Sequence, residues 1–372
     1  MGIGVGLIGS GFIGKVHALA YRAAPAVFGF EPPRLEMLAD IDDATAARAA
    51  EDLGFGRSTG DWQALVVDPA VDLVDITAPN HLHEEMALAA ISAGKAVYCE
   101  KPLAPTAAGA GRMVAAAEAA SARTMVGFNY LKNPIAAVAQ EIIESGEIGD
   151  VFGYRGWHFE DYMHDPDTLV NAWRLNPDTG DGVTSDLGSH AISMARYLIG
   201  VIAEVSARRT TVKRTRAVGE DGHEVEVAVP DTVAALVRFG GGANGTIEAS
   251  WMAAGHKHTI AAEVFGTKGT LAFDFERLSE LRLYPAGQPR GREGFTTILA
   301  GPSHPDFAAF VPAPGHQLGF NDLKTIEIRD LLVGLDPIAP APWPDFREAW
   351  EVQKVVDAII DSDQSGTWVA IG

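Results

Sequence analysis

The sequence is poor in cysteine and in basic residues. Cys99 is the single cysteine among 372 residues. A lone cysteine cannot form an intrachain disulfide, and metal sites need several ligands close together, so we predict neither a disulfide nor a metal site. The 29 Lys and Arg are outnumbered by 49 Asp and Glu, for a formal net charge of −20. Because nucleic acids and anionic membranes bind basic surfaces, neither is expected as a partner.

Long apolar runs are also lacking. No stretch of about 20 apolar residues runs without a polar interruption, so no membrane span is expected. Residues 2–14 are apolar, but they lack a basic start and are rich in glycine, which is unlike a secretory signal. We therefore expect a cytoplasmic protein. Hydrophobic residues reach 47% of the chain, enough for a buried core, and the length suggests two domains.

What the sequence does contain, at its start, is a glycine-rich turn. Residues 3–8 are expected to form a buried parallel strand, and a helix is expected over about 12–24. The glycines between them follow the G-x-G-x-x-G spacing, which permits a tight turn, close approach to phosphate and close helix packing. The pattern predicts a dinucleotide pyrophosphate at the helix N-terminus; the alternative is a strand-to-helix turn without a ligand. The binding turn comprises Gly9, Gly11, Phe12, Ile13 and Gly14.

The next predicted strand, 34–39, ends at Asp40. A carboxylate in this place can accept hydrogen bonds from the adenosine ribose hydroxyls, and it repels a 2′-phosphate. Asp42 and Asp43 add to the negative field. We therefore predict NAD rather than NADP as the cofactor. The alternative is that Asp40 caps a helix over 43–53.

Two further strands carry polar residues at their carboxyl ends, where an open α/β sheet binds its ligands. The strand 71–78 leads into Pro79-Asn80, and the strand 96–99 leads into Glu100-Lys101-Pro102. Proline cannot continue a strand ladder, so the chain leaves the sheet there and Lys101 is left at the crevice. Cys99 is expected to be a small core residue. Helices are expected over 81–94 and from Thr106 to about 121, with a last strand over 124–129.

Strand–helix alternation ends near residue 130. The chain is therefore predicted to be an α/β protein, with an N-terminal doubly wound parallel sheet in residues 1–130. A C-terminal α+β domain in 131–372 is expected to carry an open-faced, mostly antiparallel sheet, because its apolar pattern has period two and its turns are glycine-rich. Its strands are expected over 151–162, 203–214, 231–239, 245–252, 258–265 and 270–275. Its helices are expected over 134–145, 183–199, 322–333 and 345–361, with an irregular loop over 289–316.

The helix over 183–199 contains a second constellation, Asp186-Leu187-Gly188-Ser189-His190. On a helix, residues i and i+4 lie on one face, so the carboxylate and the imidazole are neighbours. A carboxylate beside an imidazole holds its tautomer and raises its basicity, which suits proton transfer. The alternative is an N-cap aspartate and a solvated histidine.

Taken in order, these motifs resemble the Gfo/Idh/MocA oxidoreductases. The resemblance rests on Gly9–Gly14, on Glu100-Lys101-Pro102 and on Asp186-x-x-x-His190, and it runs nearly end to end. The phrases Thr77–His83, Gly127–Tyr130 and Gly366–Val369 support it. The Trp173-Arg174 segment and the loop around Ser303-His304-Pro305 make the chain similar to the inositol and levoglucosan dehydrogenase-like members.

The resemblance implies a Rossmann domain, a second domain with an open-faced sheet and a site between them. It also implies the reaction, in which NAD accepts a hydride from a ring carbinol of a cyclic polyol, sugar or anhydrosugar. It implies that Lys101 polarises the hydroxyl while the Asp186–His190 pair handles its proton. It also implies that Glu100 contacts the cofactor ribose and that Thr77, Asn80, His83 and Asn129 line the cofactor. Tyr130 and Trp173 are expected either to touch substrate or to be core aromatics.

One position departs from the family's pattern. Many relatives with inositol-like substrates carry an acid three residues after the histidine, where this chain has Ser193, so the identity of the polyol stays open. Two other activities also stay open: elimination after transient oxidation, as in a lyase or glycosidase, and a regulator that only senses NAD. The resemblance further implies a homodimer or homotetramer that covers the second domain's sheet.

Overall fold

The computed structural model describes residues 2–165, 168, 170–219 and 222–372. The chain divides into two compact units. The first contains the chain up to Lys132 together with residues 319–351, and the second contains residues 133–318 and 352–372. The sequence had suggested a boundary near residue 130 and one domain over 131–372. In the structure, the segment 319–351 instead packs with the first unit.

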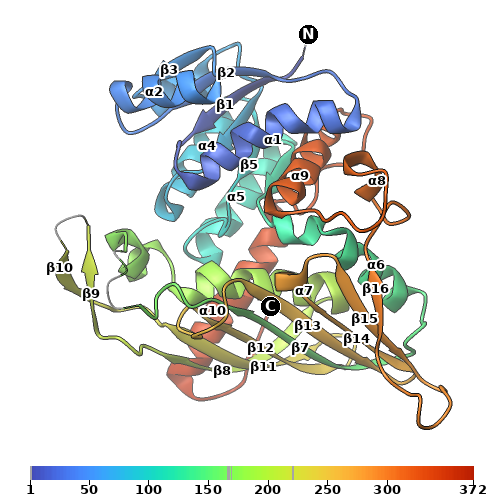
Figure 1. Ribbon diagram of the computed structural model, residues 1–372. Coiled ribbons are helices and arrows are strands. Elements are labelled where there is room, and N and C mark those ends of the chain that lie inside the picture. Colours follow the sequence, from blue (N-terminus) through green and yellow to red (C-terminus); the bar gives the residue numbers. More distant parts are fainter. Residues whose placement is uncertain (1, 166–167, 169, 220–221) are drawn as a thin grey trace. The chain divides into compact units, whose positions relative to one another are not determined.

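The first unit is built on six parallel strands in the order β3-β2-β1-β4-β5-β6 (Figure 1). The chain steps outward from β1 to β3, returns to the middle and steps outward the other way from β4 to β6. The strand order therefore reverses between β1 and β4, and ligands of such sheets bind at the carboxyl ends of the strands at that point. The strands are β1 Gly4–Ile8, β2 Arg34–Ala39, β3 Arg57–Thr59, β4 Leu73–Ile76, β5 Ala96–Cys99 and β6 Thr124–Val126.

Helices cover both faces of this sheet. On one face Val5 packs in a buried cluster with Tyr21 of α1 and Ile328 of α9. On the other face a side chain at Gly6 would meet Leu65 of α3. Helices on both faces of a parallel sheet confirm the predicted doubly wound α/β class. The helices are α1 Phe12–Phe28, α2 Asp43–Leu53, α3 Trp62–Val67, α4 His83–Ser92, α5 Ala107–Ala120, α9 Phe320–Gly334 and the start of α10 Phe346–Ser365.

The second unit is built on nine strands in the order β16-β15-β14-β13-β7-β12-β11-β8-β17. Every pair is antiparallel except β12 and β7, which run parallel. The predicted mostly antiparallel sheet is thus confirmed. Its strands are β7 Val151–Phe159, β8 Ile202–Thr210, β11 Thr232–Phe239, β12 Asn244–Ser250, β13 Thr259–Gly266, β14 Gly269–Asp274, β15 Glu280–Pro285, β16 Thr296–Leu299 and β17 Val369–Ala370. A small separate sheet pairs β9 Thr215–Val218 with β10 His223–Glu226.

One face of the large sheet is covered by helix and the other is open. Along β11, Val233, Ala235 and Val237 are buried while Ala234 and Leu236 are exposed. Helix α7 packs on β7, β12 and β13, on the buried side. The helical segments of this unit are α6 Pro134–Glu144, the π-helical turn η5 Thr184–Gly188, α7 Ser189–Ile199, α8 Phe307–Phe310, the rest of α10 and the 3₁₀ turns η3 Ala172–Leu175, η4 Pro177–Thr179 and η6 Phe275–Arg277.

Several element ends differ from the sequence predictions. Helix α1 runs past Pro25 to Phe28. Gly29 is its C-cap: it has a φ of 75°, and its backbone amide donates a hydrogen bond to the Pro25 carbonyl. The strand expected over 71–78 is confined to Leu73–Ile76, because the turn begins before Pro79. The loop expected over 289–316 contains β16 and α8. Within the described ranges, helices long and apolar enough to cross a membrane are absent.

Candidate functional site

The glycine turn after β1 has the geometry that its spacing predicts. Gly9 has a φ of 98°, which favours glycine, and a Cβ at Gly14 would lie 2.2 Å from the Gly9 carbonyl oxygen. A Cβ at Gly11 would meet nothing within 4 Å, so no described atom requires a glycine there. Gly11 has no side chain with which to cap α1, and the first turn of α1 holds no acidic residue. The space beside Gly11 is thus free for a ligand, and a helix start without a side-chain cap favours an anionic one.

Asp40 lies beside this turn. Its Oδ2 accepts hydrogen bonds from the Ser10 amide at 2.8 Å and from the Ser10 hydroxyl at 2.5 Å. The cap of α2 is Asp42, which accepts from the Thr45 amide, so the alternative interpretation of Asp40 as that cap is wrong. Thr77, after β4, donates to the Gly9 carbonyl at 2.8 Å. Two strand ends are therefore tied to the glycine turn by side chains.

Glu100 follows β5 and is almost fully buried. Its Oε1 lies 2.9 Å from His17 Nε2 and 2.9 Å from Lys324 Nζ, while its Oε2 accepts from the Lys101 amide at 3.1 Å. The Glu100 carboxylate thus links the backbone of the predicted catalytic lysine to two buried cationic or protonatable groups. The resemblance had given Glu100 a ribose contact; the structure adds this positioning contact.

The two groups behind Glu100 belong to a larger buried network. His17 Nδ1 lies 2.9 Å from Asp75 Oδ2, and Lys324 Nζ lies 2.6 Å from Glu327 Oε2. Tyr98 completes the network. Its hydroxyl accepts a hydrogen bond from Lys324 Nζ at 2.9 Å and donates one to Glu327 Oε2 at 2.5 Å. Each of these five side chains has an exposed fraction of 0%. Buried charges persist only where they are paired, and every one of these is.

The network moves the pKa values of its members in opposite directions. Burial alone would raise the pKa of Glu100, but Lys324 and His17 outweigh it and hold that pKa well below its ordinary value. For Glu327 burial wins over Lys324, and the pKa is raised. Burial would lower the pKa of His17, but Asp75 and Glu100 raise it. The Glu100 carboxylate, which lies nearest Lys101, is therefore kept ionised.

Two further predicted cofactor residues and one predicted substrate residue lie on the loops after β4 and β6. Asn80 opens the 3₁₀ turn η1 Asn80–Leu82. Asn129 opens η2 Asn129–Lys132 and is 4% exposed, and its Nδ2 has no hydrogen-bond partner in the described part of the chain. A buried amide without a hydrogen-bond partner among the described residues is suited to donate a hydrogen bond to a bound ligand. Tyr130 is buried and its ring lies 6.0 Å from that of Phe320.

His83 is placed differently from its predicted role. It is 0% exposed, with Nδ1 2.9 Å from the Pro102 carbonyl and Nε2 2.8 Å from the Ala78 carbonyl. Burial lowers its pKa, although the two carbonyls oppose that effect. The geometry argues against direct contact of His83 with the nicotinamide end. Its position instead fixes the loop after β4 against the Lys101–Pro102 turn.

In the second unit, the predicted acid–base pair lies where a π-helical turn joins α7. Asp186 is on η5, and its Oδ2 accepts from Arg174 Nη1 at 2.7 Å. The Arg174 guanidinium in turn lies 4.8 Å from the centroid of the Trp173 ring. Asp186 raises the pKa of Arg174. Trp173 is half-buried rather than a core aromatic, so the structure groups it with Arg174 and Asp186.

His190 is 6% exposed and lies in the first turn of α7. Its ring is edge-on to that of His158 on β7, with centroids 5.6 Å apart. Ser193 is buried and donates to the His190 carbonyl at 2.9 Å. The Ser193 side chain therefore faces the protein interior, and its hydroxyl is already used by the backbone.

Sequence reasoning missed the charged residues that support these groups. Asp75 interrupts the apolar run of β4, and Lys324 and Glu327 stand three apart in a buried stretch of α9. Polar residues at core positions of a sheet or helix were the available signal. Their pairing could not be read from the sequence, because Lys324 and Glu100 are separated by 224 positions.

Comparison with known proteins agrees with this geometry. Residues 3–128 match the family described as "Oxidoreductase family, NAD-binding Rossmann fold". Residues 137–272 match the family described as "GFO/IDH/MocA C-terminal domain". The predictions of an oxidoreductase and of NAD as its cofactor are confirmed. The glycine turn, the open space at Gly11 and the buried Asn129 amide fit that cofactor.

Relatives match over the full length. Levoglucosan dehydrogenase of Pseudarthrobacter phenanthrenivorans is 36% identical and is aligned over 99% of this chain and 98% of its own. A structure of levoglucosan dehydrogenase in complex with NADH and levoglucosan is 37% identical, with a TM-score of 0.94 and all of both chains covered. An NAD-binding oxidoreductase from Klebsiella pneumoniae is 43% identical, with a TM-score of 0.95 and all of both chains covered. With both family descriptions matched and a relative aligned along its whole length, the chain belongs to the Gfo/Idh/MocA family of oxidoreductases.

Proposed function

We propose that this protein is an NAD-dependent dehydrogenase that oxidises a ring carbinol of a cyclic polyol, sugar or anhydrosugar. The observation that carries the proposal is the support of Lys101. Its amide is bonded to Glu100, which the buried Lys324 and His17 hold in place and keep ionised. A lysine anchored in this way at the carboxyl edge of a dinucleotide-binding sheet is suited to orient a reacting hydroxyl. The likeness to levoglucosan dehydrogenase supports the substrate class.

The first unit would hold the cofactor through residues already described. The amides at the start of α1, above Gly11, would receive the pyrophosphate, and Asp40 would accept from the adenosine ribose. Asn129 would donate its buried amide nearer the reacting end. When bound there, NAD supplies the hydride acceptor for oxidation of the carbinol carbon.

The chain's own groups would handle the proton. Lys101 would hydrogen-bond the carbinol oxygen and stabilise the charge that develops on it, as a positioned donor does. His190, with Asp186 four positions earlier in the chain, would accept the hydroxyl proton. Arg174 would keep the Asp186 carboxylate oriented through the 2.7 Å ion pair. Because Arg174 also lies over Trp173, the carboxylate, the guanidinium and the indole form one polar and aromatic surface suited to a sugar.

The test of the reaction is the appearance of NADH, followed by absorbance. The purified protein would receive NAD with inositols, aldoses, uronates, glycosides and levoglucosan, and a parallel series would contain NADP. The proposal predicts turnover with NAD on at least one ring polyol or anhydrosugar. NAD binding without turnover on the whole panel would contradict it and would favour elimination chemistry or a sensor.

The role of Lys101 is tested by Lys101→Met, which keeps the length of the side chain and removes its charge. We expect turnover to fall by at least about 100-fold with NAD binding retained, because a positioned donor or acid–base group contributes about that much. Lys268→Met is the matched control, since Lys268 is exposed in the turn between β13 and β14. Similar turnover in the two variants would remove Lys101 from the mechanism.

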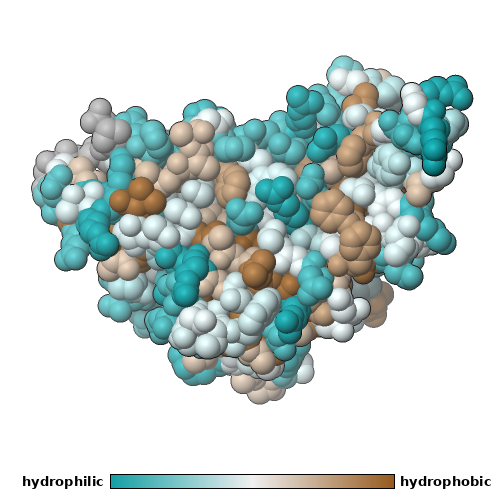
Figure 2. Space-filling model, turned by 90° about the horizontal axis from the view of Figure 1, so that it is seen from below, coloured by the Kyte–Doolittle hydropathy of each residue, from teal (hydrophilic) through white to brown (hydrophobic). Residues whose placement is uncertain are grey.

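We also propose that the open face of the large sheet mediates homo-oligomerisation. Ala234 and Leu236 are exposed on that face, and Leu236 is 52% exposed. Figure 2, seen from below, shows hydrophobic patches between hydrophilic residues. Exposed apolar area of this kind is reduced when a second copy covers it. Light scattering of Leu236→Glu should report a smaller mass than the wild type; an unchanged mass would exclude this face.

A further inference from the structure

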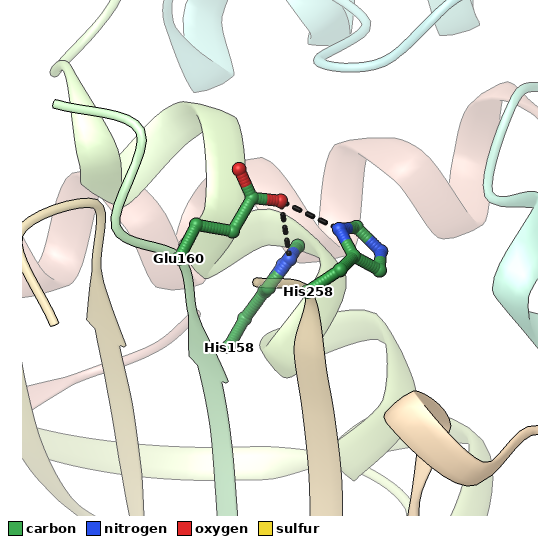
Figure 3. Close-up of side chains that lie close together, drawn as sticks. All are labelled: His158, Glu160 and His258. Carbon is green, nitrogen blue, oxygen red and sulfur yellow. Dashed lines mark hydrogen bonds and ion pairs between the residues drawn. The ribbon is translucent and has the colours of Figure 1, made fainter. Parts of the chain in front are cut away.

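A cluster of three side chains in the second unit plays no part in the mechanism above. His158 and Glu160 stand two positions apart at the end of β7, and His258 precedes β13. These strands are antiparallel and pair Phe159 with Thr259, so His258 stands opposite Glu160 on the same face of the sheet. Figure 3 shows the three side chains pointing toward one another.

The donor atoms of the cluster converge on one carboxylate oxygen. Glu160 Oε1 lies 2.6 Å from His258 Nδ1 and 3.3 Å from His158 Nε2. All three ligand atoms lie within 4.8 Å of one another. A glutamate carboxylate offers oxygen lone pairs, so Oε1 is a ligand atom that a metal ion can take.

The tautomer of His158 makes this arrangement unusual. Its Nδ1 lies 3.2 Å from the Leu187 carbonyl oxygen, which can only accept, so Nδ1 must carry hydrogen. In a neutral imidazole, Nε2 then presents a lone pair to the Glu160 oxygen. Two lone pairs in this position need a cation between them, either a second proton on a 1%-exposed histidine or a metal ion.

From this geometry we propose that His158 Nε2, Glu160 Oε1 and His258 Nδ1 bind a divalent transition-metal ion of the zinc class. Two imidazoles and a carboxylate form a three-ligand set that leaves a fourth position of a tetrahedral ion for water or another ligand. At metal–ligand distances of about 2.1 Å, tetrahedral ligands are about 3.4 Å apart. The His158–Glu160 separation is already near that value, and the His258 side chain, 38% exposed, has room to move outward.

The surroundings of the cluster resemble those of metal ligands. Metal-binding histidines usually donate their second ring nitrogen to a carbonyl or carboxylate, as His158 does to Leu187. The His258 backbone is held through its amide by Glu276 at 3.1 Å. The cluster also borders the predicted acid–base group, since the rings of His158 and His190 are edge-on. A metal here would lie next to the groups proposed to bind substrate, although the proposal concerns binding and does not depend on turnover.

The experiment uses the untagged full-length protein after treatment with a chelator, titrated with Co²⁺ and Zn²⁺. We expect one high-affinity equivalent, a visible Co²⁺ absorption band that Zn²⁺ abolishes, and a higher melting temperature with Zn²⁺. Glu160→Gln and His258→Asn, which change the ligand set with little change of shape, should weaken Co²⁺ binding by at least about tenfold. His256→Asn is the matched control, because His256 lies two positions away and bonds Thr259 instead.

Two results would overturn the proposal. One is the absence of a stoichiometric Co²⁺ band in the wild type, which would make the cluster a protonated hydrogen-bond network. The other is a loss of binding in His256→Asn equal to that in the cluster variants, which would mean that the metal binds scattered surface histidines. Circular dichroism of each variant must match the wild type, and His258→Asn, altered at the most exposed of the three positions, keeps the test valid should Glu160→Gln fail to fold.

Discussion

Replacing Lys324 by methionine tests whether the buried network supports the fold around Lys101. Methionine is unbranched and similar in length, so it preserves most of the packing while removing the charge. Lys324 contacts Glu100 at 2.9 Å, Glu327 at 2.6 Å and Tyr98 at 2.9 Å, and its side chain is fully buried. The substitution would therefore leave two buried carboxyl groups without their shared cation.

The expected loss of stability follows from the number of carboxyl groups that lose their cation. Removing one partner of a buried ion pair destabilises a protein by about 3–5 kcal/mol, because the remaining charge stays buried and uncompensated. A loss of about 4 kcal/mol raises the unfolded fraction by about 10³. With a urea dependence of about 3 kcal/mol per M, the unfolding midpoint should fall by about 1.3 M.

Urea unfolding followed by circular dichroism measures this change. The control is Lys268→Met, which alters an exposed lysine and should shift the free energy of unfolding by less than about 0.5 kcal/mol. Adding Glu327→Gln to Lys324→Met removes one of the two carboxyl groups that lost Lys324 as a partner, so it should restore at least about 1 kcal/mol. If Lys324→Met stays within about 1 kcal/mol of the wild type, the network does not hold the Glu100–Lys101 turn as argued.

Three further predictions concern the cofactor turn and the second unit. Gly11→Ala should leave the melting temperature unchanged, because its Cβ meets no described atom, yet it should weaken NAD binding by about tenfold or more. Gly14→Ala should lower both the melting temperature and the affinity for NAD, because its Cβ would lie 2.2 Å from a carbonyl oxygen. Asp40→Ala should raise the ratio of NADP to NAD turnover, and an unchanged ratio would refute its role in cofactor choice. Glu160 has a folded pKa of about 2 against 4.5 unfolded, so it stabilises the fold above pH 4.5 and loses that effect as the pH falls toward 2; Glu160→Gln should therefore flatten the acid limb of the unfolding midpoint between those values.

Much of the fold was predictable because local chemistry determined it. The helix starts at Thr106 and Asn133 carry side chains that cap them, and both caps are present. The glycine spacing at residues 9–14 predicted a turn that only glycine can form at Gly9 and Gly14. Short-range constraints of this kind act within a few residues, so they can be read from the chain directly.

Other features depended on partners far apart in the sequence. The helix expected over about 12–24 instead runs to Phe28 and is capped by Gly29. Phe28 packs against the buried cluster that contains Ile328 of α9, a contact between segments far apart in the sequence. The parallel pairing of β7 and β12 has no local signal, since both strands have the same period-two pattern as their antiparallel neighbours.

The sequence by itself determined the family and the two kinds of sheet, and it predicted the cofactor turn and the groups that we propose to move a proton. The tertiary structure alone decided how those groups are supported. His17 and Asp75 meet across 58 positions, and Glu160 and His258 across 98. Burial and pairing decide the protonation of such groups, and both arise only when distant segments pack together.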